Sequence, residues 1–194
     1  MRYPLKFSIL ALWILAGSML LAGCSEGGGA DEADARPASR ARADLSRPAW
    51  MSVDREANSV ELEIVAGETE SNDGWNYNGY SAGGARITVP EGARVTIHFR
   101  NADDVSPHRL AIAEPRDPYP GRFNGADPVF DGAVSDSPTS LDGAARPGAS
   151  ETISFTASES GDYVMMCYLP GHANGGHRIH FRVSGAGRAG FREL

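Results

Sequence analysis

The segment GDYVMMCYLPGHANGGH, residues 161–177, decides how the rest of the chain is interpreted. It begins with a short apolar run, residues 163–168, of the kind that forms a β-strand. Proline and paired glycines then predict a tight loop. Four residues separate Cys167 from His172, and four more separate His172 from His177. Thiolates and imidazoles are the ligands that copper and zinc prefer, so the segment predicts part of a metal site.

A single loop is expected to need a further ligand from elsewhere in the fold, and His108 is the candidate. It follows a polar turn and begins an apolar-alternating run, residues 108–113. Because side chains along a strand alternate between its two faces, His108 falls on the apolar face. The same alternation places His177 on the apolar face of the strand after the loop, whereas His98 and His180 fall on polar faces. The four candidate metal ligands are therefore His108, Cys167, His172 and His177.

The chain from about residue 50 onward alternates between short apolar-patterned segments and turns that contain glycine or proline. Many short strands without a long helical pattern predict an all-β sandwich. One long irregular loop, residues 114–150, separates the His108 strand from the C-terminal strands, and such loops are usually functional or partly disordered. The predicted strands are residues 60–65, 86–89, 94–100, 108–113, 151–157, 161–168 and 177–183.

The first residues have the pattern of a secretory signal. Arg2 and Lys6 precede a mostly apolar run, residues 7–21, and small residues precede Cys24. This end is similar to a bacterial lipobox, which predicts cleavage before Cys24 and lipid on its sulfur. The alternatives are an uncleaved membrane anchor and a Cys24–Cys167 disulfide, although a disulfide would join a flexible tract to a metal-type loop.

The sequence predicts four parts. Residues 1–23 are the signal peptide, and residues 24–47 are a flexible tether with too few large apolar side chains to fold. Residues 48–185 are the folded domain, and residues 186–194 are a C-terminal tail. The formal net charge is −7, which argues against a nucleic-acid partner. The domain is expected to be a monomer.

Three stretches carry a family resemblance: WNYNGYS at residues 75–81, RITVPEG at residues 86–92, and the cysteine loop at residues 167–176. They resemble the cupredoxins, the blue-copper electron carriers, and within them the sulfocyanin-like branch. The resemblance spans about residues 60–183. It implies a Greek-key β-sandwich or barrel that holds one type 1-like copper ion.

The resemblance also implies a role for each candidate ligand. His108, Cys167 and His172 take the places of the equatorial copper ligands. His177 stands where the branch usually has a methionine, and its imidazole is expected to make the site less blue, with a lower potential. His177 as a plain strand residue stays open. Zinc is a further alternative, because one cysteine and three histidines suit a tetrahedral site.

The function implied is that of a copper protein that carries single electrons between extracytoplasmic redox partners, of the cytochrome or oxidase type. Lipid on Cys24 would tether it to a bacterial membrane, on the periplasmic or cell-surface side. In this family electrons leave through the downstream histidine, and Leu169, Pro170 and Ala173 are expected to form an apolar patch around His172. The protein is not expected to be an enzyme.

Two other functions stay open. A strong axial donor from His177 would suit a copper enzyme or a site for a small ligand such as nitric oxide. The domain could instead bind or deliver copper. The aromatic side chains of Trp75, Tyr77 and Tyr80 are expected to pack in the fold rather than to relay electrons. Met165 and Met166 are expected to fill the core rather than to act as axial ligands.

Overall fold

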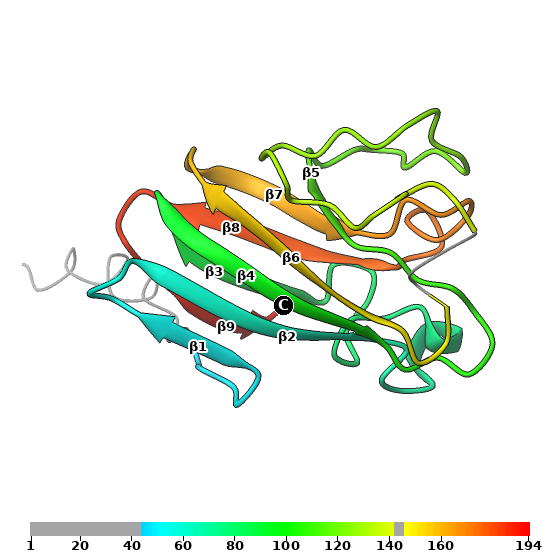
Figure 1. Cartoon of the computed structure of the whole chain (residues 1–194), viewed down its shortest axis with the longest axis horizontal. Helices are drawn as coiled ribbons and strands as arrows, with labels where there is room; N and C mark the ends of the chain where they lie inside the picture. The colour runs from blue at the N-terminus through cyan, green and yellow to red at the C-terminus, as the bar shows by residue number, and fades with distance from the viewer. Residues whose placement is uncertain (1–43, 142–145) are drawn as a thin grey trace, which may run out of the picture. The chain divides into compact units, whose positions relative to one another are not determined.

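The computed structural model describes residues 44–141 and 146–194, so the predicted signal peptide, Cys24 and most of the predicted tether lie outside it. Its strands are β1 (Met51–Asp54), β2 (Ser59–Ala66), β3 (Ala85–Pro90), β4 (Ala93–Asn101), β5 (Ala111–Ala113), β6 (Ser150–Ala157), β7 (Gly161–Met166), β8 (Arg178–Ser184) and β9 (Gly190–Glu193). One sheet has the order β1-β2-β4-β6, and the other has the order β5-β7-β8-β3-β9 (Figure 1).

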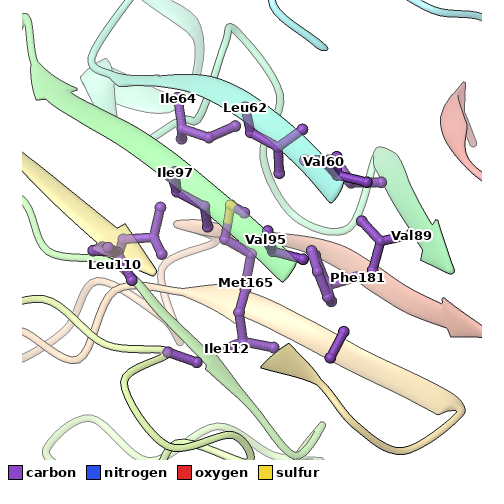
Figure 2. Close-up of a cluster of buried hydrophobic side chains, with 14 of the residues drawn as sticks. Val60, Leu62, Ile64, Val89, Val95, Ile97, Leu110, Ile112, Met165 and Phe181 are labelled. Carbon is purple, nitrogen blue, oxygen red and sulfur yellow. The ribbon is translucent and has the colours of Figure 1, made fainter. Parts of the chain in front are cut away.

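β2 and β4 show how the sequence pattern builds the core. The two strands run parallel, with Leu62 opposite Ile97, and buried side chains alternate with exposed ones along both. Met165 and Phe181 from the other sheet belong to the same buried cluster (Figure 2). Each fully buried side chain of this size contributes about 1.5–3 kcal/mol. The predicted all-β sandwich is confirmed, as is the place of Met165 in its core.

The strand predicted over residues 108–113 is shorter than expected, because β5 contains only the last three of these residues. The Arg109 N–H donates to Sγ of Cys167 (3.4 Å), and the Leu110 N–H donates to Oγ of Ser135 (2.8 Å). These backbone groups are paired with side chains instead of a neighbouring strand. The residues before β5 therefore face inward without joining the sheet.

The last residues of the chain belong to the sandwich. β9 pairs antiparallel with β3, and Phe191 is 5% exposed, with its ring centroid 5.0 Å from that of Trp50. Ser46 and Phe191 exchange two backbone hydrogen bonds. The compact unit therefore begins before residue 48 and runs beyond residue 185, the ends predicted for the domain. Neither end has a repeating apolar pattern, and strand pairing, backbone hydrogen bonds and the burial of Phe191 join both ends to the sandwich.

The long irregular loop covers one face of β5 and β7. Ile112 and Met165 face the core between the sheets, whereas Ala111 and Met166 face the loop. Tyr119, Phe123, Ala126 and Val134 of the loop pack against that second face. This coverage explains why all three residues of β5 are buried.

Helical structure is nearly absent from the described part of the chain. It is limited there to one short 3-10 turn, η1 (Ser71–Gly74). No helix within these residues has the length and apolar character needed to cross a membrane.

Candidate metal centre

Two separate segments bring the four predicted ligands together. His108 precedes β5, whereas Cys167, His172 and His177 lie on the loop between β7 and β8. The ligand atoms of the four side chains all lie within 4.8 Å of one another. Three of the residues are fully buried, and His172 is 6% exposed. The predicted set is therefore assembled in space, and the binding of a metal by these four residues stays a prediction.

His108 is oriented by Asp103, five residues earlier. Nε2 of His108 lies 2.9 Å from Oδ2 of Asp103, and the buried Nδ1 has no hydrogen-bond partner among the described residues. Burial lowers the pKa of His108, and the hydrogen bond and charge of Asp103 offset only part of this effect. The imidazole is therefore neutral at pH 7, with a lone pair on one nitrogen.

Asp103 itself is held as a carboxylate. Burial raises its pKa, but hydrogen bonds from the Ser106 and Val105 amides and from His108 outweigh burial, so that the pKa is lower than usual. An ionised carboxylate accepts hydrogen bonds and donates none.

Cys167 follows the last residue of β7 and is fully buried. Burial raises the pKa of its thiol to about 12, against the smaller opposing effects of the Leu169 and Arg109 amides. Its sulfur accepts the Arg109 N–H and lies 3.5 Å from Nδ1 of His172. The thiol therefore keeps its proton at neutral pH unless a metal ion displaces it.

Backbone hydrogen bonds fix the loop between β7 and β8. The His172 N–H donates to the Leu169 carbonyl (3.1 Å), and the His177 N–H donates to the His172 carbonyl (2.8 Å). Trp75 stacks on His172, with ring centroids 4.3 Å apart and planes 13° apart. The loop passes so close to this indole that a Cβ at Gly175 would lie 2.5 Å from the ring. Trp75 therefore packs, as predicted, but it packs on a candidate ligand.

His177 is the most enclosed candidate imidazole. It is fully buried, and neither ring nitrogen makes a hydrogen bond of ordinary geometry with the described residues; the Asn76 backbone lies close enough only to oppose part of the pKa shift. Burial, and then the neighbouring His108 and His172, hold its pKa well below the usual range. Its ring centroid lies 4.2 Å from that of Tyr77, whose hydroxyl donates to the Arg109 carbonyl. Tyr77 thus packs directly against one candidate ligand.

The donors present fit a copper ion. Burial, and then the neighbouring His108, lower the pKa of His172 to about 4, so the third imidazole is also neutral at pH 7. Buried nitrogens without a partner cost free energy, and His108 and His177 each have at least one. A metal ion would satisfy them. Neutral imidazoles with one thiolate suit copper, and the donor types alone would also suit zinc.

Of the three residues predicted to form an apolar surface patch around His172, two are buried and only Pro170 is half-buried. Leu169 and Ala173 are 0% and 1% exposed. The long loop covers this side, because its Tyr119 and Phe123 pack against the cluster that contains Ala173. His172 is covered instead by Trp75, which is half-buried. The alternation of apolar residues predicts that a strand is buried, but it does not show which loop lies over it.

Sequence reasoning did not single out Asp103. A carboxylate in a polar turn is common and usually faces solvent. The available signal was its place in a tight turn just before a candidate ligand.

Comparisons with known proteins identify the family of this chain. A family model for the sulfocyanin (SoxE) domain matches residues 49–191. This chain belongs to the sulfocyanin domain family. A sulfocyanin from Sulfolobus acidocaldarius is 27% identical over 124 residues, which cover 61% of this chain. The chain spans only 60% of the length of that relative. The sulfocyanin-like resemblance is thereby confirmed, and copper is the metal that this family and the donor set share.

Solved structures of several proteins are similar to this sulfocyanin-family chain. A reduced auracyanin from Roseiflexus castenholzii is 28% identical, with a TM-score of 0.46, over 64% of this chain and 96% of that one. Auracyanin A of Chloroflexus aurantiacus, a "blue" copper protein, is 21% identical, with a TM-score of 0.42, over 65% and 99%. Rusticyanin from Thiobacillus ferrooxidans is 20% identical, with a TM-score of 0.42, over 70% and 88%.

Proposed function

We propose that this sulfocyanin-family protein carries single electrons between redox partners outside the cytoplasm. The observation that carries the proposal is the cluster of four donor side chains, buried between a loop and the segment before β5. Copper, when bound, supplies a one-electron couple. The partners we expect are cytochrome- or oxidase-type proteins that dock on a monomer.

The residues around the cluster support this role because they hold the donors still. The His177 amide is bonded to the His172 carbonyl, and the His108 ring is bonded to Asp103. Close packing on all sides keeps the donors from rearranging. A site whose donors do not move when the charge changes needs little reorganisation for each electron.

The side of the centre where Trp75 covers His172 is the best candidate for electron exchange with a partner. His172 is the candidate ligand with measurable exposure, at 6%. Trp75 is half-buried and stacks on it. A partner that contacts the indole would be one ring away from a ligand, so we place the docking surface at Trp75.

A copper enzyme or a small-ligand site is the second candidate, because an imidazole stands where the family usually has a thioether. The burial of the donor side chains favours an electron carrier over an enzyme or a small-ligand site. Four donors already surround the centre, and they are 0–6% exposed. Nitric oxide or peroxide added to the copper-loaded protein should leave its spectrum unchanged. A new absorption band or a changed paramagnetic-resonance signal would favour the enzyme.

Spectroscopy of the copper-loaded full-length protein tests the main proposal. We expect thiolate-to-copper charge-transfer absorption and a reversible one-electron couple, because Cys167 supplies the thiolate. Cys167→Ser should abolish the absorption, and His98→Asn, at an exposed position outside the cluster, should leave it intact. A wild-type protein that shows neither the band nor the couple would rule out the carrier.

The membrane tether is proposed from the sequence pattern that ends at Cys24. Lipid on this cysteine would hold the protein in the membrane fraction of cells. Cys24→Ala should release it from that fraction, whereas Cys167→Ala should not. If the Cys24→Ala protein stays with the membranes, the anchor is not lipid on this residue.

A further inference from the structure

We propose that Asp103 is a positioning residue of the metal centre, whose carboxylate holds His108 in the one tautomer that leaves Nδ1 free for the metal. The inference rests on the proposed copper site, but part of its test needs no metal.

The geometry leaves one arrangement of protons. Oδ2 of Asp103 lies 2.9 Å from Nε2 of His108, and the two side chains are 11% and 0% exposed. Because a carboxylate only accepts hydrogen bonds, the shared proton belongs on Nε2. The lone pair is then on Nδ1, which is buried and has no other partner among the described residues. The hydrogen bond at one ring nitrogen thus decides which nitrogen can bind a metal.

Asp103 is held in place by its other oxygen. Oδ1 accepts hydrogen bonds from the Val105 and Ser106 amides, both at 2.8 Å. The Asp103 N–H donates to Oδ1 of Asn101, which is fully buried (2.9 Å). One carboxylate oxygen therefore closes the turn that follows β4, and the second is directed at the imidazole.

Two glycines leave room for this carboxylate. A Cβ at Gly74 would lie 2.7 Å from Oδ2 of Asp103, and a Cβ at Gly67 would lie 2.6 Å from its Cβ. Both glycines also have a positive φ, of +81° and +66°, which disfavours any other residue. Packing and hydrogen bonds thus hold the Asp103 side chain in one position.

A carboxylate behind a ligating imidazole makes the imidazole a stronger donor. A stronger donor favours Cu(II) over Cu(I). Asp103 is therefore expected to lower the reduction potential in addition to fixing the ring. Removing such a partner typically costs about 10–100-fold in metal affinity.

Asp103→Asn tests the hydrogen bond to His108 and leaves the turn in place. The Asn side chain keeps an oxygen for the two turn amides, but its other group is an NH2, which cannot accept a hydrogen bond from the imidazole. Asp104→Asn is the matched control, since it removes the same charge from an exposed neighbour. In the full-length copper protein we expect Asp103→Asn to weaken Cu(II) binding about tenfold relative to Cu(I). That factor raises the reduction potential by about 59 mV. Equal shifts in the two variants would overturn the proposal.

Nitrogen-15 NMR of the metal-free full-length protein gives the second readout. In the wild type we expect the His108 proton on Nε2, and in Asp103→Asn we expect it to move toward Nδ1. A wild-type proton on Nδ1 would overturn the proposal. Failure of the protein to bind copper would instead contradict the proposed function and leave this tautomer result standing.

Discussion

At the scale of single residues, the four candidate ligands are made distinctive by their burial. Three of them have no exposed surface, and no imidazole among them carries a charge at neutral pH. Each donor therefore loses hydration on folding that only a partner inside the protein can replace. His177 is expected to matter most for the character of the centre, because the family resemblance implies a methionine at this place and an imidazole is a stronger donor than a thioether.

His177→Met should raise the reduction potential and strengthen the blue absorption. A thioether is a weaker donor than an imidazole, so Cu(II) would lose stabilisation relative to Cu(I) and the thiolate would dominate the absorption. Voltammetry and paramagnetic resonance of the copper-loaded variants measure both effects. His180→Met changes an exposed histidine on β8 and should have no effect. If His177→Met also leaves the potential unchanged, His177 does not bind the metal.

Copper binding should release about one proton per ion at pH 7. The Cys167 thiol, with a pKa of about 12, is protonated in the metal-free protein. The imidazoles are already neutral, since the pKa of each is lowered, that of His172 to about 4. The apparent affinity should therefore rise about tenfold per pH unit between pH 7 and pH 8.

Calorimetric titrations in buffers of different ionisation enthalpy count the protons released. Release of two or more protons would mean that at least one imidazole is charged before the metal arrives. Cys167→Ser, titrated in the same way, should release none.

At the scale of elements, β9 and the long loop show what the sandwich gains from segments without a clear pattern. β9 contributes four residues to the edge of a sheet, and Phe191 packs there against Trp50 and Tyr80. The described part of the long loop packs on the opposite face of the β5–β7 pair from the core. Both elements add aromatic side chains to the packing of the sandwich.

Phe191→Ala should destabilise the protein by about 3 kcal/mol, because it leaves a cavity where an aromatic ring was buried. Urea unfolding of the full chain, followed by circular dichroism, measures the change. Arg192→Ala alters the next residue, whose side chain is exposed, and should cost less than about 0.5 kcal/mol. Equal effects of the two substitutions would mean that β9 does not anchor the sandwich.

At the scale of the whole described domain, the metal centre joins parts of the chain that are far apart in sequence. His108 comes from the connection between β4 and β5, which links the two sheets, and the other three ligands come from the β7–β8 loop. A metal bound by both segments favours the folded state, because the unfolded chain does not hold the four donors together.

Removal of copper should therefore lower the midpoint of thermal unfolding. With free copper at about 100 times the dissociation constant, binding adds about 2.7 kcal/mol of stability. For a domain of this size that corresponds to roughly 5–10 °C. Differential scanning calorimetry with copper and with a chelator compares the two states. Cys167→Ser should show a much smaller difference, and an equal difference would place the bound copper elsewhere.

The sequence by itself determined the fold class and the candidate ligands. Alternation with a period of two placed His108 and His177 on buried faces, and His98 and His180 on exposed ones. The spacing of Cys167 and His172 in a Gly- and Pro-rich loop identified the chemistry. These signals are local or periodic, so they can be read from neighbouring residues.

Only the tertiary structure decided what surrounds the ligands. The contacts of Asp103 with His108 and of Trp75 with His172 depend on the conformations of turns and loops. No periodic sequence pattern predicts these conformations. The same holds for the pairing of β9 with β3 and for the burial of Leu169. In each case packing in three dimensions determines which residues are in contact. A sequence pattern can predict that a side chain is buried, but it does not predict which residues surround that side chain.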